Sequence, residues 1–294
     1  MVSKASVISK LAVLGALLMV AIPAAPVPGQ ELDGTLKKVK TSGTLTIGYR
    51  ESSPPFSFVG SDKRPAGYSI DLCLHIARAV QKQLGLADLK LAWVPVTPES
   101  RIPAVVQGRV DIECGSTTAS LSRQEQVDFS LMTFVDGGSL LTLQTSNLRG
   151  LGDLAGKRIA VAPGTTTEKS LAEFLRTEFV TVQTVAVKDH AEGLAALESG
   201  KVDAYASDRG ILVGLAIQTG NPKRFGIADF LFSYEPYGFM VRRNDAAFRL
   251  VVNRALAELY RSGQVADIFS RWLGAFGKPS PALAAMYRLN ALPE

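Results

Sequence analysis

The chain has 294 residues and a mass of 31.4 kDa, with 47% hydrophobic and 20% charged residues. This length accommodates one large domain or two of ordinary size, and this composition excludes a disordered, collagen-like or coiled-coil protein. The sequence holds 2 cysteines and 2 histidines and no HExxH pattern, so it lacks a disulfide-rich scaffold and the common sets of zinc ligands. We therefore expect no metal and no other cofactor.

The first thirty residues are typical of a secretory signal. Lys4 and Lys10 precede an apolar run over 11–25, and Pro26 follows it. This run is shorter than the roughly 20 apolar residues of a membrane-spanning helix, and no cysteine follows that would carry a lipid. We expect residues 1–30 to be a cleaved signal peptide and the product to be periplasmic and free of a lipid anchor. A membrane anchor is the alternative, and the cleavage position stays open.

The charge balance gives no support to a nucleic-acid partner. Removing the two signal lysines from the 32 basic residues leaves 30, against 27 acidic residues. These basic residues are scattered, with no run longer than Arg242-Arg243, and they do not alternate with aromatic residues along one element. We expect no nucleic-acid binding.

Strands and helices alternate along the rest of the chain, which predicts parallel sheets flanked by helices. The apolar periodicity predicts strands over 45–49, 89–96, 110–114, 140–143, 158–161, 182–187 and 203–206, and helices over 71–85, 100–107, 167–179, 191–199 and 246–262.

Two pairs of similar runs indicate that the second half of this pattern repeats the first. Residues 107–112 (QGRVDI) resemble 199–204 (SGKVDA), and 43–47 (GTLTI) resemble 156–160 (GKRIA). Chance similarity between helix-to-strand turns is the alternative. With the length, the repeat favours two α/β lobes that bind a ligand at the carboxyl ends of their strands.

The predicted strand ends carry anion-binding groups, hydroxyls and one aspartate. They are Arg50, Arg101, Ser116, Thr118, Thr165, Thr166, His190 and Asp208. Thr165 and Glu168 fit a capping box, so a helix N-terminus with free N–H groups, which attracts anions, is expected there. Ser116 lies outside any GxSxG sequence and has no histidine nearby in the chain, so the set predicts binding and no catalytic residue.

Each of these residues also has a purely structural explanation. Surface ion pairs would account for the arginines, and helix capping for Asp208 or His190. Turn hydrogen bonds would account for the hydroxyls. Cys73 and Cys114 are compatible with two buried thiols or with one disulfide, and the sequence leaves this open.

A set of longer runs resembles one known family over about residues 32–290. The runs are YRESSPPFSF, GYSIDLC, SRIPAVVQGRVDIECGSTT, SRQEQVDFS, GTTTEKSL, KDHAEGLAALESGKVDAYASD and EPYGFMVRRND. They are similar to the solute-binding proteins of polar amino-acid ABC transporters, bacterial solute-binding family 3, and most of all to the glutamate/aspartate-binding branch.

This resemblance implies an α/β, two-lobed type II periplasmic-binding-protein fold. Each lobe would be a mostly parallel sheet flanked by helices, and two crossover strands would join the lobes. We place lobe 1 at 31–142 and 239–294 and lobe 2 at 143–238. The crossovers are expected near 139–144 and 237–242, and the helix at 246–262 and the segment around Trp272 are expected on lobe 1.

The resemblance also implies a role for each site residue. Arg101 would bind the ligand α-carboxylate, helped by backbone N–H groups near Thr118 and Thr165. Asp208, with Ser116 and Thr118, would hold the α-ammonium.

Arg50 and His190 would receive a side-chain carboxylate. Pro98 departs from the family, where close relatives often carry a ligand-contacting serine. Charge supports an acidic ligand independently, because Arg50 and Arg101 against Asp208 give the site +1 and glutamate or aspartate brings −1.

We therefore expect a monomeric binding protein that captures L-glutamate or L-aspartate by lobe closure and delivers it to an ABC membrane permease. A periplasmic enzyme similar to cyclohexadienyl dehydratase is one alternative, and it requires a free acid such as Glu51 or Asp208. A soluble ligand sensor is the other. The sequence leaves open the order of glutamate, aspartate and their amides, the affinity and the cognate permease.

Overall fold

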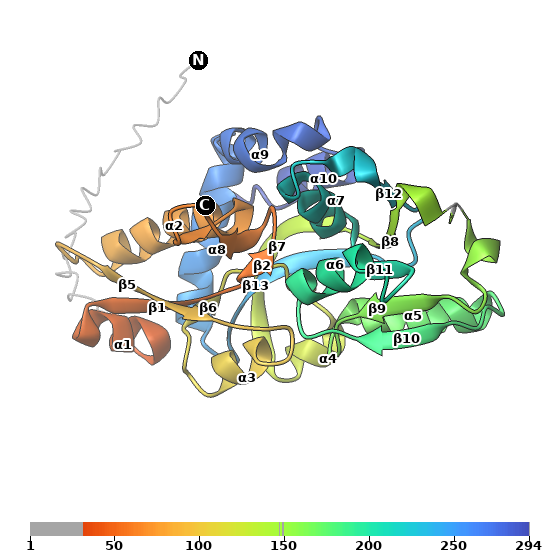
Figure 1. Cartoon of the computed structure of the whole chain (residues 1–294). Coiled ribbons are helices and arrows are strands. Elements are labelled where there is room, and N and C mark those ends of the chain that lie inside the picture. The colour runs from red at the N-terminus through yellow and green to blue at the C-terminus, as the bar shows by residue number, and fades with distance from the viewer. Residues whose placement is uncertain (1–31, 147, 149, 294) are drawn as a thin grey trace, which may run out of the picture. The chain divides into compact units, whose positions relative to one another are not determined.

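The computed structural model describes residues 32–146, 148 and 150–293, so the predicted signal peptide at 1–30 lies outside the described residues. Asp33–Glu294 form one compact unit, and its described strands make two five-stranded sheets and one small sheet (Figure 1). The first sheet has the order β5 (Lys90–Pro95), β1 (Thr44–Tyr49), β6 (Ile112–Glu113), β13 (Glu235–Arg242), β7 (Val127–Asp136). The second has the order β10 (Gln183–Ala186), β9 (Arg158–Val161), β11 (Ala204–Asp208), β8 (Gly138–Leu143), β12 (Phe225–Ile227). The small sheet is β2 (Ser52–Ser53), β3 (Ser57–Val59), β4 (Pro65–Ala66).

Five helices lie close to where the periodicity predicts them, at 71–85, 100–107, 167–179, 191–199 and 246–262, and the others were not predicted. Those that flank the first sheet are α1 (Gly34–Ser42), α2 (Tyr68–Gln83), α3 (Arg101–Val106), α4 (Leu121–Gln124), α8 (Ala246–Arg261), α9 (Val265–Leu273) and α10 (Pro281–Leu289). Those that flank the second are α5 (Thr166–Thr177), α6 (His190–Glu198) and α7 (Arg209–Gln218). Among the described residues no helix is long and apolar enough to cross a membrane.

Both sheets follow the same pattern of strand directions. β1 is parallel to β5 and β6, whereas β13 is antiparallel to β6 and β7, so β13 alone runs against the other strands of its sheet. In the second sheet β9 is parallel to β10 and β11, and β8 is the strand that runs against the rest. The expected mostly parallel sheets are confirmed.

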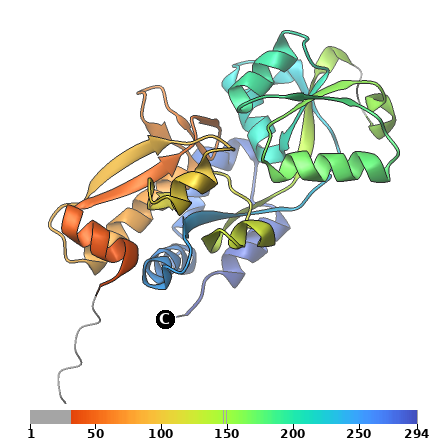
Figure 2. The same cartoon turned by 90° about the horizontal axis from the view of Figure 1, so that it is seen from below.

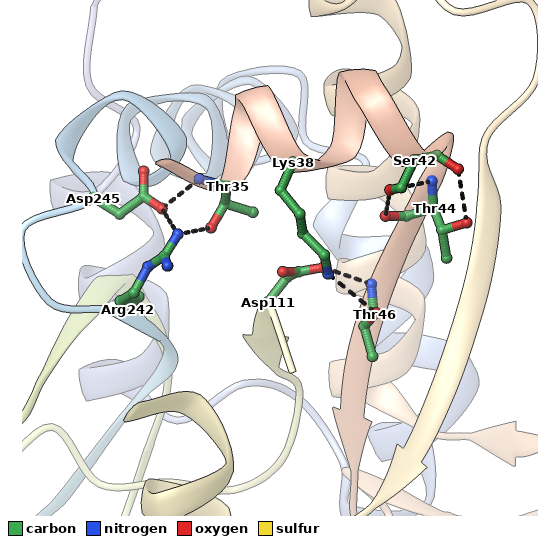
Figure 3. A network of polar contacts seen from close by, with 8 residues as sticks. All are labelled: Thr35, Lys38, Ser42, Thr44, Thr46, Asp111, Arg242 and Asp245. Carbon is green, nitrogen blue, oxygen red and sulfur yellow. Dashed lines mark hydrogen bonds and ion pairs between the residues drawn. The ribbon is translucent and has the colours of Figure 1, made fainter. Parts of the chain in front are cut away.

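The repeated runs 107–112 and 199–204 occupy equivalent places in the two sheets. Asp111 N–H donates to Thr46 O, and its carboxylate accepts from Thr46 N–H, each at 2.8 Å. Asp203 makes the same pair of bonds with Arg158, also at 2.8 Å each. Figure 3 shows the first of these carboxylates between Thr46 and the ammonium of Lys38. The similarity of the two runs therefore reflects one helix-to-strand turn used twice.

The crossovers differ from the expected positions. The chain leaves the first sheet at Asp136 and enters the second at Gly138, and it returns between Ile227 and Glu235. The crossovers predicted near 139–144 and 237–242 fall within strands β8 and β13, so the strand pairing places the passages between the sheets a few residues earlier in the chain. The run Asp136-Gly137-Gly138 at the junction of β7 and β8 marks a turn, but it does not show that the chain changes sheet there. We define the first lobe as 33–136 and 235–293 and the second lobe as 138–227, instead of divisions at 142 and 238 (Figure 2).

The disulfide question left open by the sequence is settled by the structure. Cys73 on α2 is bonded to Cys114, which follows β6, with a Cα–Cα distance of 6.3 Å. Both cysteines are at most 1% exposed. The bond therefore ties the loop after β6, which carries Ser116 and Thr118, to the main helix of the first lobe.

The C-terminal part of the chain packs on the first lobe, as expected. α8 contacts α2 and β7, and the indole N–H of Trp272 donates to Asp71 at 2.8 Å. The lobes also touch directly at α7, where a Cβ on Gly214 would lie 2.4 Å from the carbonyl oxygen of Pro54. Only a glycine lets the helix approach the first lobe this closely.

Candidate functional site

A cavity lies between the carboxyl ends of the two sheets. All of the predicted site residues line it, together with several neighbours from the second lobe. The lining residues are Arg50, Arg101, Ser116, Thr118, Ala162, Thr165, Thr166, Thr167, His190, Tyr205, Ala206, Ser207, Asp208 and Ile211.

The first lobe contributes two buried guanidinium groups. Arg50 and Arg101 are 2% and 3% exposed, so neither forms the surface ion pair considered above. Arg101 Nη1 donates to Thr117 Oγ1 at 2.8 Å, and that hydroxyl donates to Glu113 Oε2 at 2.8 Å. Among the described atoms, Arg50 Nη2 and Arg101 Nε have no acceptor. Buried donors require partners, so these two groups favour an anionic ligand.

The buried Arg50 guanidinium remains charged at neutral pH. Burial, and then the nearby charge of Arg101, lowers the pKa of Arg50 to about 10. This value still leaves the group protonated in the cell. The site therefore holds a fixed positive charge at Arg50.

The second lobe contributes a helix N-terminus. Thr165 is the N-cap of α5, and its hydroxyl accepts from Glu168 N–H at 3.0 Å. The Glu168 carboxylate accepts from Gly164 N–H instead of Thr165 N–H, so the predicted capping box is present in modified form. The first N–H groups of such a helix, at Thr166 and Thr167, have no partner within the helix and can bind a carboxylate.

His190 lies inside the site and makes no surface pair. It is 5% exposed, and its Nδ1 is 2.5 Å from the hydroxyl of Tyr205. Burial and the charges of Arg50 and Arg101 hold the His190 pKa well below its usual value of 6.5, so the ring is neutral. With Tyr205 as donor to Nδ1, the imidazole proton is on Nε2, where it can be donated to a ligand.

Asp208 is held by side chains and does not cap the helix that follows. It occupies the N-cap position of α7 without any side-chain capping bond. Its carboxylate accepts from Thr167 Oγ1 at 3.0 Å and from the hydroxyl of Tyr237. Burial, and then the charge of Glu235, raises the Asp208 pKa to about 6, so it is mainly ionised at neutral pH.

Three important neighbours of Asp208 were missed by sequence reasoning: Asp136, Glu235 and Tyr237. Burial, followed by the charge of Asp208, raises the Asp136 pKa to about 8. Tyr237 and Glu235 belong to the quoted run EPYGFMVRRND, which was given no role in the site. Their place next to the cavity depends on the return of the chain to the first sheet, for which no local pattern gives a signal.

Glu235 fixes the hydroxyls of two predicted site residues. Thr118 Oγ1 and Thr166 Oγ1 donate to Glu235 Oε2 at 2.5 and 2.6 Å. A carboxylate only accepts hydrogen bonds, so both hydroxyl protons are used in this way. The remaining lone pairs of the threonine oxygens can then accept from a ligand cation, as the role assigned to Thr118 requires.

The sequence-based charge count for the site was incomplete. Besides Arg50, Arg101 and Asp208, the surroundings of the cavity include buried ionisable groups that the count omitted. They are Glu113, Arg123, Asp136 and Glu235. What distinguishes the site is the placement of charge, because the unpaired guanidinium donors of Arg50 and Arg101 belong to the first lobe and the Asp208 carboxylate belongs to the second. This arrangement complements a zwitterion.

Sequence comparisons agree with the quoted motifs. The family model for bacterial extracellular solute-binding proteins, family 3, matches residues 45–275. The L-glutamate/L-aspartate-binding protein of Pseudomonas aeruginosa is 41% identical to this chain, over 91% of this chain and 88% of that protein. The glutamate/aspartate import solute-binding protein of Escherichia coli K12 is 35% identical, over 91% and 86%.

Structural comparisons give the same fold with other ligands. An ancestral arginine-binding protein bound to arginine has a TM-score of 0.70 and 29% identity, and the match covers 79% of this chain and 99% of that one. An ancestral amino acid-binding protein described as a precursor of cyclohexadienyl dehydratase has a TM-score of 0.70 and 28% identity, with coverage of 81% and 99%. The two-lobed fold is therefore confirmed, and the chain belongs to family 3 of the bacterial extracellular solute-binding proteins.

Proposed function

We propose that this protein captures L-glutamate or L-aspartate between its lobes and delivers it to an ABC permease, with no chemistry on the ligand. The observation that carries the proposal is the pair of buried arginines with unsatisfied donors, Arg50 and Arg101, facing a cavity whose other side holds Asp208. An acidic amino acid has two carboxylates for the former and one ammonium for the latter.

The proposed pose follows from the donors and acceptors. Arg101 and the N-terminus of α5 bind the α-carboxylate. Asp208 and the oxygen of Thr118 accept from the α-ammonium. Arg50 and the Nε2–H of His190 bind the side-chain carboxylate, and Ser116 lies at the wall of the same cavity.

The second arginine selects the ligand class. A neutral ligand such as glutamine would leave a charge-assisted bond to Arg50 unmade, at a cost of about 1–3 kcal/mol. A basic ligand would place a third cation beside Arg50 and Arg101 in a largely enclosed site, which is more unfavourable still. The names of the related proteins from Pseudomonas and Escherichia support the same ligand class.

A non-enzymatic role is supported by the state of the acids. Both oxygens of Asp208 already accept hydrogen bonds, from Thr167 and Tyr237. Glu51 is exposed and does not line the cavity. Asp136 does not line it either, so no acid is free for proton transfer to a ligand there. The likeness to a precursor of cyclohexadienyl dehydratase is the observation that favours an enzyme, and it concerns the fold.

The remaining parts of the proposal concern the setting of the protein. We propose that it is a periplasmic monomer, exported by its signal peptide and free of a lipid anchor. A buried disulfide fits an oxidising compartment. The permease partner follows from the transport role of the family.

The test is calorimetry on residues 31–294 after unfolding and refolding to remove any carried ligand. Titrants are L-glutamate, L-aspartate, L-glutamine, L-histidine and L-arginine. We expect saturable one-to-one binding of the two acidic amino acids, weaker binding of glutamine and none of arginine. Preferential binding of a basic or neutral amino acid would refute the assignment of Arg50 and His190.

A further inference from the structure

Glu235 is a buried carboxylate with no role in the proposed ligand pose. It begins strand β13, where the chain returns to the first lobe, and it is 1% exposed. It does not belong to the residues that line the cavity. A buried charge is retained only when its bonds compensate for lost hydration, so the partners of Glu235 indicate what it does.

Those partners come from both lobes. Thr118 follows β6 in the first lobe, and Thr166 begins α5 in the second, and both hydroxyls donate to the same oxygen, Glu235 Oε2. The other oxygen, Oε1, accepts from Ser233 Oγ at 2.6 Å. Ser233 Oγ in turn accepts from Gly138 N–H at 2.9 Å, so the carboxylate is also anchored to the outgoing crossover.

Other contacts between the lobes gather at the same point. The hydroxyl oxygens of Thr118 and Thr166 are 3.2 Å apart. Arg123 donates to the carbonyl of Thr118 at 2.9 Å and, across the lobes, to the carbonyl of Gly164 at 3.3 Å. These bonds exist only while the N-terminus of α5 stands against the loop after β6, which is the closed arrangement of the lobes.

We infer that Glu235 is a positioning residue that latches the two lobes in the closed form by holding Thr118 and Thr166 together. This inference rests on the proposed function, in which closure retains an amino acid. Glu235 itself contacts no ligand group in the proposed pose, so its loss changes mainly how long the ligand stays bound and has little influence on which ligand enters. Because the latch forms after entry, its loss accelerates release and leaves association nearly unchanged.

The experiment measures association and dissociation rates of L-glutamate by stopped flow for the wild type, four single variants and one double variant. Glu235→Ala removes the acceptor, and we expect release to be roughly tenfold faster or more, with association within about threefold. Thr166→Val removes the second-lobe donor and should also accelerate release. In the double variant the two effects should not add, because either change opens the same contact.

Two further variants separate the latch from general damage. Glu235→Gln keeps an oxygen that can accept both hydroxyls, so its release rate should lie between those of the wild type and Glu235→Ala. Asp128→Asn is the matched control, because this carboxylate bonds only within the first lobe, to Asn244 N–H and Arg249. Its rates should equal those of the wild type.

The inference is overturned if folded Glu235→Ala releases L-glutamate at the same rate as the wild type. It is also overturned if association slows equally in all variants. If Glu235→Ala does not fold, the comparison of Glu235→Gln with Thr166→Val decides, and additive effects in their double variant refute the latch. Failure of the wild type to bind acidic amino acids refutes the proposed function instead. The rates are then measured with whichever amino acid binds in the calorimetric panel, since Glu235 touches no ligand atom in either case.

Discussion

The two lobes share one strand order but present opposite chemistry to the cavity. The first lobe offers the guanidinium groups of Arg50 and Arg101, braced by a disulfide and by the Thr117–Glu113 contact. The second offers Asp208, a neutral histidine and a helix N-terminus. Sheets with the same order therefore position the loops, and the loops alone decide the charge. In the proposed pose Arg101 of the first lobe and the N-terminus of α5 in the second bind the same carboxylate, so we expect binding and closure to be coupled.

The largest effect on ligand affinity is expected when one of the two arginines of the first lobe is removed. Arg101→Ala leaves the α-carboxylate without its main partner in a buried site, so affinity for L-glutamate should fall roughly 100-fold or more. Calorimetry measures the change. Arg158→Ala is the matched control in the second lobe, because that guanidinium pairs with Asp203 at the surface and is 40% exposed. An unchanged affinity in Arg101→Ala would contradict the assigned pose.

Removing the disulfide should lower the stability of the first lobe more than that of the second. The bond closes a loop with a sequence separation of 41 residues, for which the expected stabilisation is about 2–4 kcal/mol. The double variant Cys73→Ala/Cys114→Ala should lose this amount in urea unfolding. Hydrogen exchange should show the loss mainly in α2, β1 and β6, and little in β9 to β11. A uniform loss over both lobes would contradict independent bracing of the first.

The pH dependence of binding tests the role of Asp208, the acidic group that the second lobe contributes to the site. The ligand ammonium requires ionised Asp208, whose pKa is about 6 in the ligand-free protein. Protonation competes with the ligand, so affinity should be nearly level above pH 7 and fall by up to about tenfold per pH unit below pH 6. Burial and the charges of Arg50 and Arg101 hold the His190 pKa well below 6.5, which opposes protonation of this ring as the pH falls.

Calorimetry from pH 5 to pH 8 measures this profile. Asp208→Asn should bind weakly and lose the dependence on pH, whereas Asp229→Asn, which removes an exposed carboxylate just after β12, should behave as the wild type. Affinity that rises toward acid pH would indicate a protonated histidine bound to the ligand and would refute the neutral His190.

The smallest effect is expected at the two equivalent helix-to-strand turns, which contain Asp111 and Asp203. The Asp111 side chain is 6% exposed and that of Asp203 is 30% exposed, although both accept from a strand N–H. Asp111→Ala leaves a more deeply buried donor unpaired, so it should reduce the free energy of unfolding by about 1 kcal/mol more than Asp203→Ala does. Urea unfolding checks the difference. Equal losses would show that burial does not distinguish the turns.

The sequence was sufficient for the residues at the carboxyl ends of the parallel strands. Each predicted site residue lies after the carboxyl end of a strand or at the start of a helix. Parallel strands bring such positions together at one edge of a sheet, so all eight residues line one cavity. The carboxylates Asp136 and Glu235 were out of reach, because they sit at the crossovers. Glu235 meets Thr118 across 117 residues of sequence, and only the insertion of β13 between β6 and β7 brings them into contact.

The crossovers themselves show the same limit. β7 and β8 belong to different sheets but follow each other with a single residue between them, Gly137. Apolar periodicity shows which side chains of a strand are buried, but it does not show in which lobe's core they are buried. Lobe boundaries therefore required the strand pairing.

The buried disulfide has a practical consequence for observing the lobes in motion. The chain has 2 cysteines, both joined in that bond and at most 1% exposed. A thiol-reactive dye thus has no native target on the folded protein. Cysteines introduced at Phe179 in the second lobe and Leu289 in the first, which are 95% and 75% exposed, can be labelled selectively. Energy transfer between the two dyes then follows opening and closing molecule by molecule, on an otherwise unmodified background.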